Sequence, residues 1–470
     1  MNFKSISFYL SLFCFPISFS AIINILYSSY FDYFLSIESY FLTLIFSAAL
    51  GTGFYFFGKK SDKKINFIDQ LILIILVYII VGFLISTPFY LSNFKVSFLS
   101  AFFESISGLT GTGFSTFENV KYLDPTLILW RSSSQWIGGL FFLFFLVLIF
   151  SNKSFNYKMT NLTYTGENII QSNQNIKDNI LKIFIYYSIL SFIFLVLLNI
   201  SGIRLFNSLN LTMTLVSGGG FLPSNSLSEI ISTNFQKIVL ILALIISMLN
   251  FYLLFNLFSK KTLVRDHKED FYLLFLAIIF IFLIYLYDLN GLNIFISIVS
   301  SLANSGISLI KSDNNLSLYF LLITIIGGSL ISNSSGIKLT RFYILLKITS
   351  GEIIKLISPN SVIKKTIFNS DNKITDEDIR FSFLIFISFF ISLFILSTFL
   401  VFDNIGFEKS FKLAILALTN TVNSEMYNLQ NLNFSDLLIS SKMALIIFMI
   451  IGKIELISVF LIFKKILFKD

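Results

Sequence analysis

The sequence is poor in the residues that most often build disulfides, metal centres and catalytic sites. It has one cysteine, Cys14, and one histidine, His267, in 470 residues. A single cysteine excludes a disulfide or a thiolate metal site within the chain, and a single histidine in a basic connection is expected to be an ordinary exposed loop residue. The sequence contains no nucleophile–base pair, no paired carboxylates on one helix face and no phosphate-binding loop. We therefore expect a protein that is not an enzyme and carries no cofactor.

Charge is also scarce, and long hydrophobic runs take its place. Only 13% of the residues are charged and 55% are hydrophobic, with 59 phenylalanines against five prolines. This composition is typical of a membrane protein with many spans and not of a soluble globular domain. A spanning helix needs about 20 apolar residues. The sequence therefore predicts an all-α polytopic membrane protein with about ten transmembrane helices, at 5–28, 36–57, 67–91, 126–150, 180–200, 236–258, 269–288, 316–347, 380–402 and 438–466.

The lysines and arginines predict the orientation of these spans. They cluster in every second connection, first at Lys59, Lys60, Lys63 and Lys64 and again after the fourth, sixth and eighth runs. The positive-inside rule places these connections and both termini in the cytoplasm. The net charge of +8 then reflects membrane topology, and no nucleic-acid partner is expected. The first run starts like a signal peptide but stays apolar past Ala21, which favours a retained span.

The four connections on the opposite side share one pattern. Each has an apolar stretch of about 10–13 residues, too short to cross a bilayer but suited to a re-entrant half-helix. Each then breaks into glycine, asparagine and hydroxyl residues. Aligned on the break, they are LTGTGF from Leu109, VSGGGF from Val216, LANSGI from Leu302 and LTNTVN from Leu418. The sequence therefore predicts a fourfold internal repeat.

Flexible polar backbone at this depth indicates a pore. Non-helical backbone is tolerated within a membrane only where it is buried in protein or lines water. Four such segments can direct carbonyl oxygens at a dehydrated cation, and close packing of small residues between helices is the alternative. The residues expected to bind the ion in this filter are Thr110, Gly111, Thr112, Gly113, Ser217, Gly218, Gly219, Gly220, Asn304, Ser305, Gly306, Asn420, Thr421 and Val422.

The order and spacing of the motifs resemble the TrkH/KtrB superfamily of potassium-translocating subunits. Four stretches carry the resemblance: SGLTGTGF from Ser107, WIGGLFFLFF from Trp136, IGGSLISNSSGIKLTRF from Ile326 and MIIGKIELISVFLIF from Met449. The resemblance implies two N-terminal spans followed by four repeats of span, half-helix, filter and span. Their expected boundaries are 1–58 for the N-terminal pair and 59–150, 151–260, 261–350 and 351–470 for the repeats.

The resemblance also implies a function and partners. It implies potassium uptake across the bacterial cytoplasmic (inner) membrane, with the potassium ion as substrate. It further implies a homodimer in the lipid bilayer and a separate cytoplasmic nucleotide-binding regulatory subunit similar to TrkA. An alternating-access transporter would have inverted halves, whereas the repeats here all have the same orientation.

A charge inside the last run carries a further expectation. Lys453 lies in an apolar span, where a charge is costly and usually tied to function, and in the family this position is an arginine that faces the pore. The family has an intramembrane loop, acting as a gate, where Gly327, Gly328 and Gly336 interrupt the eighth run. We therefore expect Lys453 to face the pore beside this interruption. The alternatives are pairing with Glu455, snorkelling of the lysine, and a polar kink in place of a gate.

The fourth filter departs from the family pattern. Val422 stands where the family has glycine, and a β-branched residue suits a left-handed backbone position poorly. The alternatives to potassium transport are therefore a sodium-selective or poorly selective monovalent cation transporter, or a non-conducting paralogue with a scaffold role.

Carboxylates flank the first filter. Glu104 precedes it, and Glu118 and Asp124 follow it. Negative charge near a pore mouth raises the local cation concentration, so these residues are candidates for steering ions. A structural hydrogen bond is the alternative for Glu104, and an ordinary solvated loop is the alternative for the other two.

Overall fold

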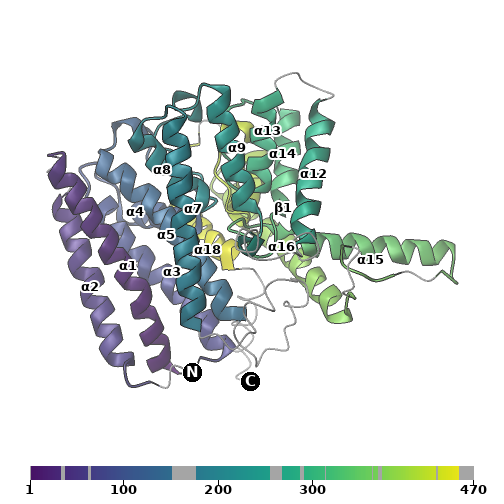
Figure 1. Cartoon of the computed structure of the whole chain (residues 1–470), viewed down its shortest axis with the longest axis horizontal. Helices are drawn as coiled ribbons and strands as arrows, with labels where there is room; N and C mark the ends of the chain where they lie inside the picture. The colour runs from purple at the N-terminus through teal and green to yellow at the C-terminus, as the bar shows by residue number, and fades with distance from the viewer. Residues whose placement is uncertain are drawn as a thin grey trace.

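The computed structural model describes residues 2–32, 37–61, 65–150, 176–253, 267–285, 291–312, 314–361, 364–368, 373–429 and 432–454. In these ranges the chain is mostly helical, and its long helices form one bundle (Figure 1). The first two helices, α1 (Phe3–Tyr30) and α2 (Ile37–Gly58), pack on each other at one edge of the bundle.

The helices that follow, apart from α15 (Leu339–Ile357), repeat one order four times: a helix, a short helix of 12 or 13 residues, a non-helical segment and a further helix. The groups are α3 (Phe67–Tyr90), α4 (Phe98–Thr110) and α5 (Pro125–Phe150); α7 (Ile176–Ile200), α8 (Leu205–Val216) and α9 (Asn234–Met248); α12 (Lys268–Tyr285), α13 (Gly291–Leu302) and α14 (Asn314–Ile325); and α16 (Asp376–Phe402), α17 (Phe407–Leu418) and α18 (Ile439–Ile454). Short 3-10 turns follow three of the non-helical segments: η2 (Val120–Tyr122), η4 (Leu227–Glu229) and η5 (Glu425–Tyr427).

The connection between the third and fourth groups is built differently. After α14 the chain forms β1 (Ile326–Gly327), which pairs in parallel with β2 (Ile337–Lys338), and residues 328–335 between them are buried. The helix α15 (Leu339–Ile357) then projects from the bundle (Figure 1). The eighth expected run is thus interrupted at the glycines that the sequence indicated.

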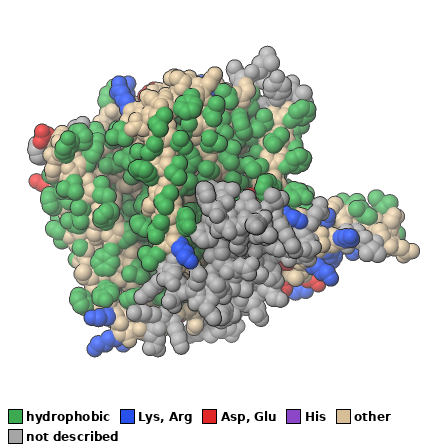
Figure 2. All heavy atoms as spheres, viewed as in Figure 1, with side chains coloured by type: hydrophobic (Ala, Val, Ile, Leu, Met, Phe, Trp, Pro, Cys, Tyr) green, Lys and Arg blue, Asp and Glu red, His purple; other side chains and the backbone are tan. Residues whose placement is uncertain are grey.

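Six helices of the described ranges are long and apolar enough to cross a membrane: α1, α2, α3, α5, α7 and α16. The other four expected spans correspond to α9, α12, α14 and α18, whose described helices have 15, 18, 12 and 16 residues. Figure 2 shows hydrophobic side chains over most of the visible flank, with Lys and Arg mainly at its lower edge and around α15.

The protein exposes many large apolar side chains and buries several charged ones. Large apolar side chains such as Phe192 and Phe282 are 66% and 63% exposed, whereas the charged side chains Arg131 and Lys453 are buried. Lipid, unlike water, accepts apolar surface, and polar groups in such a protein must find partners inside. The protein is therefore an integral membrane protein.

Glycines let long helices approach the ends of the short ones. A Cβ atom at Gly138 of α5 would collide with the carbonyl oxygen of Leu109 near the end of α4. One at Gly452 of α18 would collide in the same way with the carbonyl of Leu418, the last residue of α17. These contacts position two of the four non-helical segments against the bundle.

One expectation about an isolated residue is wrong. His267 is not exposed: it is buried, and its Nδ1 lies 3.1 Å from the Oδ2 atom of Asp270. His267 directly precedes α12, and its place in a basic connection of the sequence does not predict its burial.

Candidate cation pathway

Each of the four short helices ends in the same turn. The third residue of each of the four aligned six-residue motifs (LTGTGF, VSGGGF, LANSGI and LTNTVN) has a left-handed backbone. Its φ angle is +79° at Gly111, +68° at Gly218, +56° at Asn304 and +49° at Asn420. Its N–H donates to the carbonyl three residues earlier, and in repeats two to four the next N–H donates to the carbonyl five residues earlier. The two bonds together, in repeats two to four, are the Schellman ending, which uses a left-handed residue, usually glycine and sometimes asparagine. The aligned repeat of the sequence thus corresponds to a repeated backbone geometry.

The fifth motif residue differs between the repeats. Gly113 (φ +81°) and Gly306 (φ +74°) are left-handed again, whereas Gly220 and Val422 are not. The expectation that valine would strain a left-handed position is therefore wrong, because the backbone of Val422 does not enter that region. Val422 therefore shares the backbone class of Gly220, from which it differs by the side chain that it adds.

Asparagine side chains join the later segments to their neighbours. The Nδ2 atom of Asn420 donates to Thr112 Oγ1 of the first segment (3.0 Å) and to a backbone carbonyl of α18 (2.9 Å). Asn304 repeats this pattern one segment earlier, because its Nδ2 donates to Thr421 Oγ1 of the fourth segment (3.4 Å) and to a backbone carbonyl of α14 (2.7 Å). Each asparagine therefore ties its own turn both to the next segment and to the helix that follows.

The other neighbouring segments also touch. The hydroxyl of Ser305 donates to the carbonyl of Gly219 (2.7 Å), which joins the third segment to the second. A Cβ atom at Gly113 would lie only 3.1 Å from the backbone of Gly220, so the first and second segments are in close contact. The four segments thus form a ring in the order one, two, three, four. On one side of the ring lies a cavity of about 300 Å³, lined by residues that follow all four segments.

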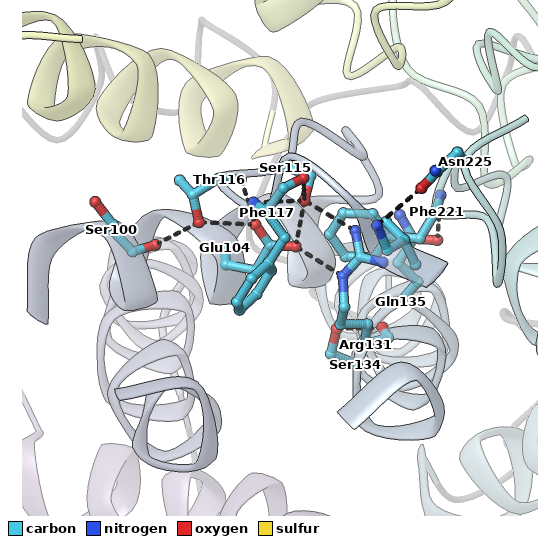
Figure 3. A network of polar contacts seen from close by, with 11 residues as sticks. Ser100, Glu104, Ser115, Thr116, Phe117, Arg131, Ser134, Gln135, Phe221 and Asn225 are labelled. Atoms are coloured by element: carbon cyan, nitrogen blue, oxygen red, sulfur yellow. Dashed lines mark hydrogen bonds and ion pairs between the residues drawn. The ribbon is translucent and has the colours of Figure 1, made fainter. Parts of the chain in front are cut away.

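A buried ion pair supports the first segment (Figure 3). The Nε atom of Arg131 on α5 lies 2.8 Å from Glu104 Oε1 on α4, and both side chains are buried. Glu104 also accepts hydrogen bonds from the hydroxyl of Ser115 (3.0 Å) and the N–H of Thr116 (2.7 Å), which follow the motif. For Glu104 the structural alternative therefore holds, and it does not face the ion path as a free charge.

The same face of α5 supports the second segment. The guanidinium of Arg131 lies 4.1 Å from the ring centre of Phe221, and Gln135 Oε1 accepts the N–H of Phe221 at 3.1 Å (Figure 3). Arg131 and Gln135 are four residues apart, so they lie on one face of the helix. Sequence reasoning missed both. Arg131 was detectable, since it is a charge inside an apolar run, the same signal that singled out Lys453.

Lys453 lies beside the interruption of the eighth run, as the sequence predicted. Its Nζ atom donates to the backbone carbonyl of Asn333 at 2.8 Å and lies 4.7 Å from the ring centre of Phe142. The side-chain amide of Asn333 donates in turn to the carbonyl of Val216, the last residue of α8 (2.8 Å). The lysine and the interruption therefore meet each other beside the first and second segments. The alternative partner Glu455 lies outside the described residues.

Close packing shapes the loop between β1 and β2. A Cβ atom at Gly327 would collide with the carbonyl oxygen of Ser335, and one at Gly328 would lie 2.5 Å from the carbonyl oxygen of Met248. Gly336 is left-handed, with φ of +73°. The Nζ atom of Lys338, a buried lysine that sequence reasoning did not single out, donates to the carbonyl of Ser334 within the loop at 2.5 Å.

The two other carboxylates differ in position. Glu118 lines the cavity and accepts a hydrogen bond from Asn433 at 3.0 Å. Asp124 is not among the residues that line the cavity; it directly precedes α5, and its carbonyl accepts the N–H of Leu127. Partial burial raises the pKa of the Asp124 carboxyl above its usual value. Of this pair, Glu118 is the one that lines the cavity.

The chain is similar to known cation transporters over most of its length. A family model described as TrkH, cation transport protein, matches residues 36–316. An uncharacterized cation transporter from Methanocaldococcus jannaschii is 29% identical, covering 92% of this chain and 90% of its own. The Trk system potassium uptake protein TrkG of Escherichia coli is 25% identical over 91% of both chains. The crystal structure of the potassium transporter TrkH from Vibrio parahaemolyticus has the same fold, with a TM-score of 0.87 over 98% of both chains at 18% identity.

Fold and similarity together define a polytopic membrane protein of the cation-transporter class. The matched region covers more than half of the chain. The protein belongs to the TrkH family of cation transport proteins, which confirms the resemblance seen in its motifs. These relatives are named as transporters, which supports the expectation that the protein is not an enzyme.

Proposed function

We propose that this protein takes up potassium ions across the cytoplasmic membrane through the centre of the ring. The observation that carries the proposal is the set of four equivalent chain breaks that meet at one place inside a membrane bundle. Backbone carbonyls at such breaks can replace the hydration shell of a cation. The four short helices can direct their partly negative C-terminal ends at the same point. The names of the relatives TrkG and TrkH support potassium as the ion.

The fourteen motif residues are the ion-binding residues of this proposal. They are 110–113 of the first segment, 217–220 of the second, 304–306 of the third and 420–422 of the fourth. Lys453, together with the loop that contains Gly327, Gly328 and Gly336, forms the gate. The hydrogen bond from Lys453 to Asn333 supports this pairing, since it joins a fixed positive charge to the loop beside the first and second segments.

The proposed assembly follows the Trk system. The chain divides at residues 58, 150, 260 and 350 into an N-terminal helix pair and four repeats, and both termini are cytoplasmic. Two copies form a homodimer in the bacterial inner membrane, and a separate nucleotide-binding subunit similar to TrkA regulates them. The two Trk system relatives support a partnership of this kind.

A second function is favoured by one observation. Val422 adds a side chain where the other repeats have glycine, and this side chain contacts Gly113 and Gly220. A pathway narrowed in this way suits a sodium-selective or poorly selective cation transporter, or a non-conducting paralogue with a scaffold role.

Rescue of a potassium-uptake-deficient bacterium at low potassium, together with ion flux into liposomes, tests the proposal. We expect the wild-type protein to restore growth and to pass potassium. The variant Gly220→Ala should fail, because its Cβ would collide with Val422. The matched variant Gly53→Ala on α2 should behave as wild type, because nothing lies within 4 Å of the added atom. Sodium flux that exceeds potassium flux would favour the second function, and no cation flux in a folded protein would leave only the scaffold role.

A further inference from the structure

The side chain of Val422 lies against the glycines of two other repeats. A Cβ atom at Gly113 would lie 3.0 Å from Val422 Cγ2. One at Gly220 would collide with Val422 Cβ and lie 2.7 Å from Cγ1. The isopropyl group therefore fills the space in front of the first and second segments, which those glycines leave open.

The ring order shows that this contact crosses the interior of the ring. Hydrogen bonds join segment four to one, three to four and three to two, and backbone contact joins one to two. Segments two and four are therefore opposite each other. A side chain on segment four that touches Gly220 must reach across the ring, whereas a side chain packed outward would touch only helices behind its own segment.

The backbone of Val422 is also engaged. Its carbonyl oxygen accepts the N–H of Ser424 at 3.1 Å, and a Cβ atom at Gly306 would lie 2.6 Å from the same oxygen. Val422 lines the cavity together with Gly113 and Gly220. An ion that moves from the cavity to the inner motif residues must therefore pass the isopropyl group before it reaches their carbonyls.

We propose that Val422 forms an apolar constriction at the cavity end of the pathway and limits the rate of ion passage. This inference rests on the proposed function. An ion at this point must give up water while the methyl groups offer no oxygen in exchange, and apolar constrictions of this kind restrict conduction by dewetting. The φ angle of Val422 is not left-handed, so a change at this position acts through the side chain and not through relief of backbone strain.

Three substitutions at this position separate size from polarity. V422G removes the side chain, V422A removes its two methyl groups, and V422T keeps the shape while replacing one methyl group with a hydroxyl. Potassium flux is measured in liposomes with equal amounts of protein that elutes as a single species. V239A on α9, which shortens a buried valine outside the cavity lining, is the matched control.

We expect V422G to raise potassium flux by about tenfold or more, V422A and V422T to raise it less, and V239A to leave it unchanged. Flux no higher than wild type in both V422G and V422A would overturn the constriction. Should V422G fail to fold, V422A alone decides. A V422T protein no faster than wild type would overturn its apolar character. If neither wild type nor any variant passes a monovalent cation, the proposed function itself fails; a conducting wild type with unchanged variants rejects only this inference.

Discussion

The first two segments of the ring and the last two make the same turn with different residues. Gly111 and Gly218 occupy the left-handed position in the first half, and Asn304 and Asn420 occupy it in the second half. In the second half, the asparagine amides bind the helix that follows and the next segment. In the first half, the left-handed residue is glycine and has no side chain to make such bonds. There α5 supports the segments through Arg131 and Gln135.

The residues next to each turn explain why glycine makes it in the first half and asparagine in the second. A Cβ atom at Gly111 would lie 3.9 Å from Lys453 Nζ, and one at Gly218 would lie 3.6 Å from Asn333. Glycine therefore leaves space where the lysine and the loop approach the ring, and asparagine fills the space where they do not. The backbone turn is common to the four repeats, and the residue that makes it depends on the local neighbour.

The largest effect is expected from breaking the support of the first half. Arg131→Ala leaves the buried carboxylate of Glu104 without its ion-pair partner, which typically destabilises a protein by about 3–5 kcal/mol. Unfolding of the purified protein in mixed detergent micelles measures the loss. Arg204→Ala, at an exposed arginine, is the control and should change little. Equal stability of the two variants would show that the ion pair does not support the first segment.

The second prediction concerns Lys453, whose Nζ atom lies close to Gly111 of the first segment. At ~6 Å and an effective dielectric of ~20, a lysine repels a potassium ion by roughly 3 kcal/mol, which is about a hundredfold in occupancy. Lys453→Ala should therefore raise unregulated potassium flux in liposomes by up to about a hundredfold without changing the order of ion preference. Unchanged or lower flux in a folded variant would assign Lys453 a structural role.

The third prediction concerns the asparagine side chains that support the third and fourth segments. Asn420→Ala loses two hydrogen bonds and also places alanine, which has a Cβ atom, in the left-handed region. Asn420→Gly loses only the two hydrogen bonds. We expect both variants to be less stable than wild type, and the alanine variant to be the weaker by about 1 kcal/mol. The same unfolding titration measures both. If the glycine variant matched wild type, the amide hydrogen bonds would contribute nothing to the ring.

A fourth substitution, Gly111→Asn, gives a turn of the first half the residue type that makes the turn in the second half. Asn tolerates the left-handed region, and a Cβ atom at Gly111 meets only ordinary contacts at 3.8–4.0 Å. The longer amide of Gly111→Asn would displace Lys453. Doubling the distance between the lysine and the ion halves the repulsion, so flux should rise by about tenfold. Combined with Lys453→Ala, the asparagine should add nothing, and an additive increase would contradict the shared mechanism.

The smallest effect is expected at the cavity. Glu118→Gln removes a charge from its wall, which should lower potassium uptake at low ionic strength by about twofold through weaker steering. At 1 M salt the Debye length is about 3 Å, so the difference should vanish. Asp124→Asn is the matched control, since that residue does not line the cavity. An equal effect of both substitutions would indicate general surface charge and not steering.

The repeat pattern was sufficient to predict where the four short helices end. Aligning the four breaks placed Gly111, Gly218, Asn304 and Asn420 at one position, and all four share one backbone geometry. The glycines around 327 also predicted the break between α14 and α15. These features depend on local residue chemistry, which a single sequence carries.

Contacts between repeats could not be predicted in this way. Asn420 and Thr112 are 308 residues apart, and neither motif indicates that their side chains form a hydrogen bond. Arg131 and Glu104 were each visible as charges near apolar runs, but their pairing depends on how α4 packs against α5. For Val422 the sequence suggested backbone strain, whereas its effect lies in a side chain that crosses the ring.

Anomalous scattering from crystals soaked in thallium(I), a heavy substitute for potassium, tests the central claim most directly. We expect a peak on the axis of the ring, within coordination distance of backbone carbonyls from all four segments. Soaking in excess potassium should remove it. A protein that passes potassium but binds thallium only outside the ring, or not at all, would contradict the assignment of these four segments as the ion-binding site.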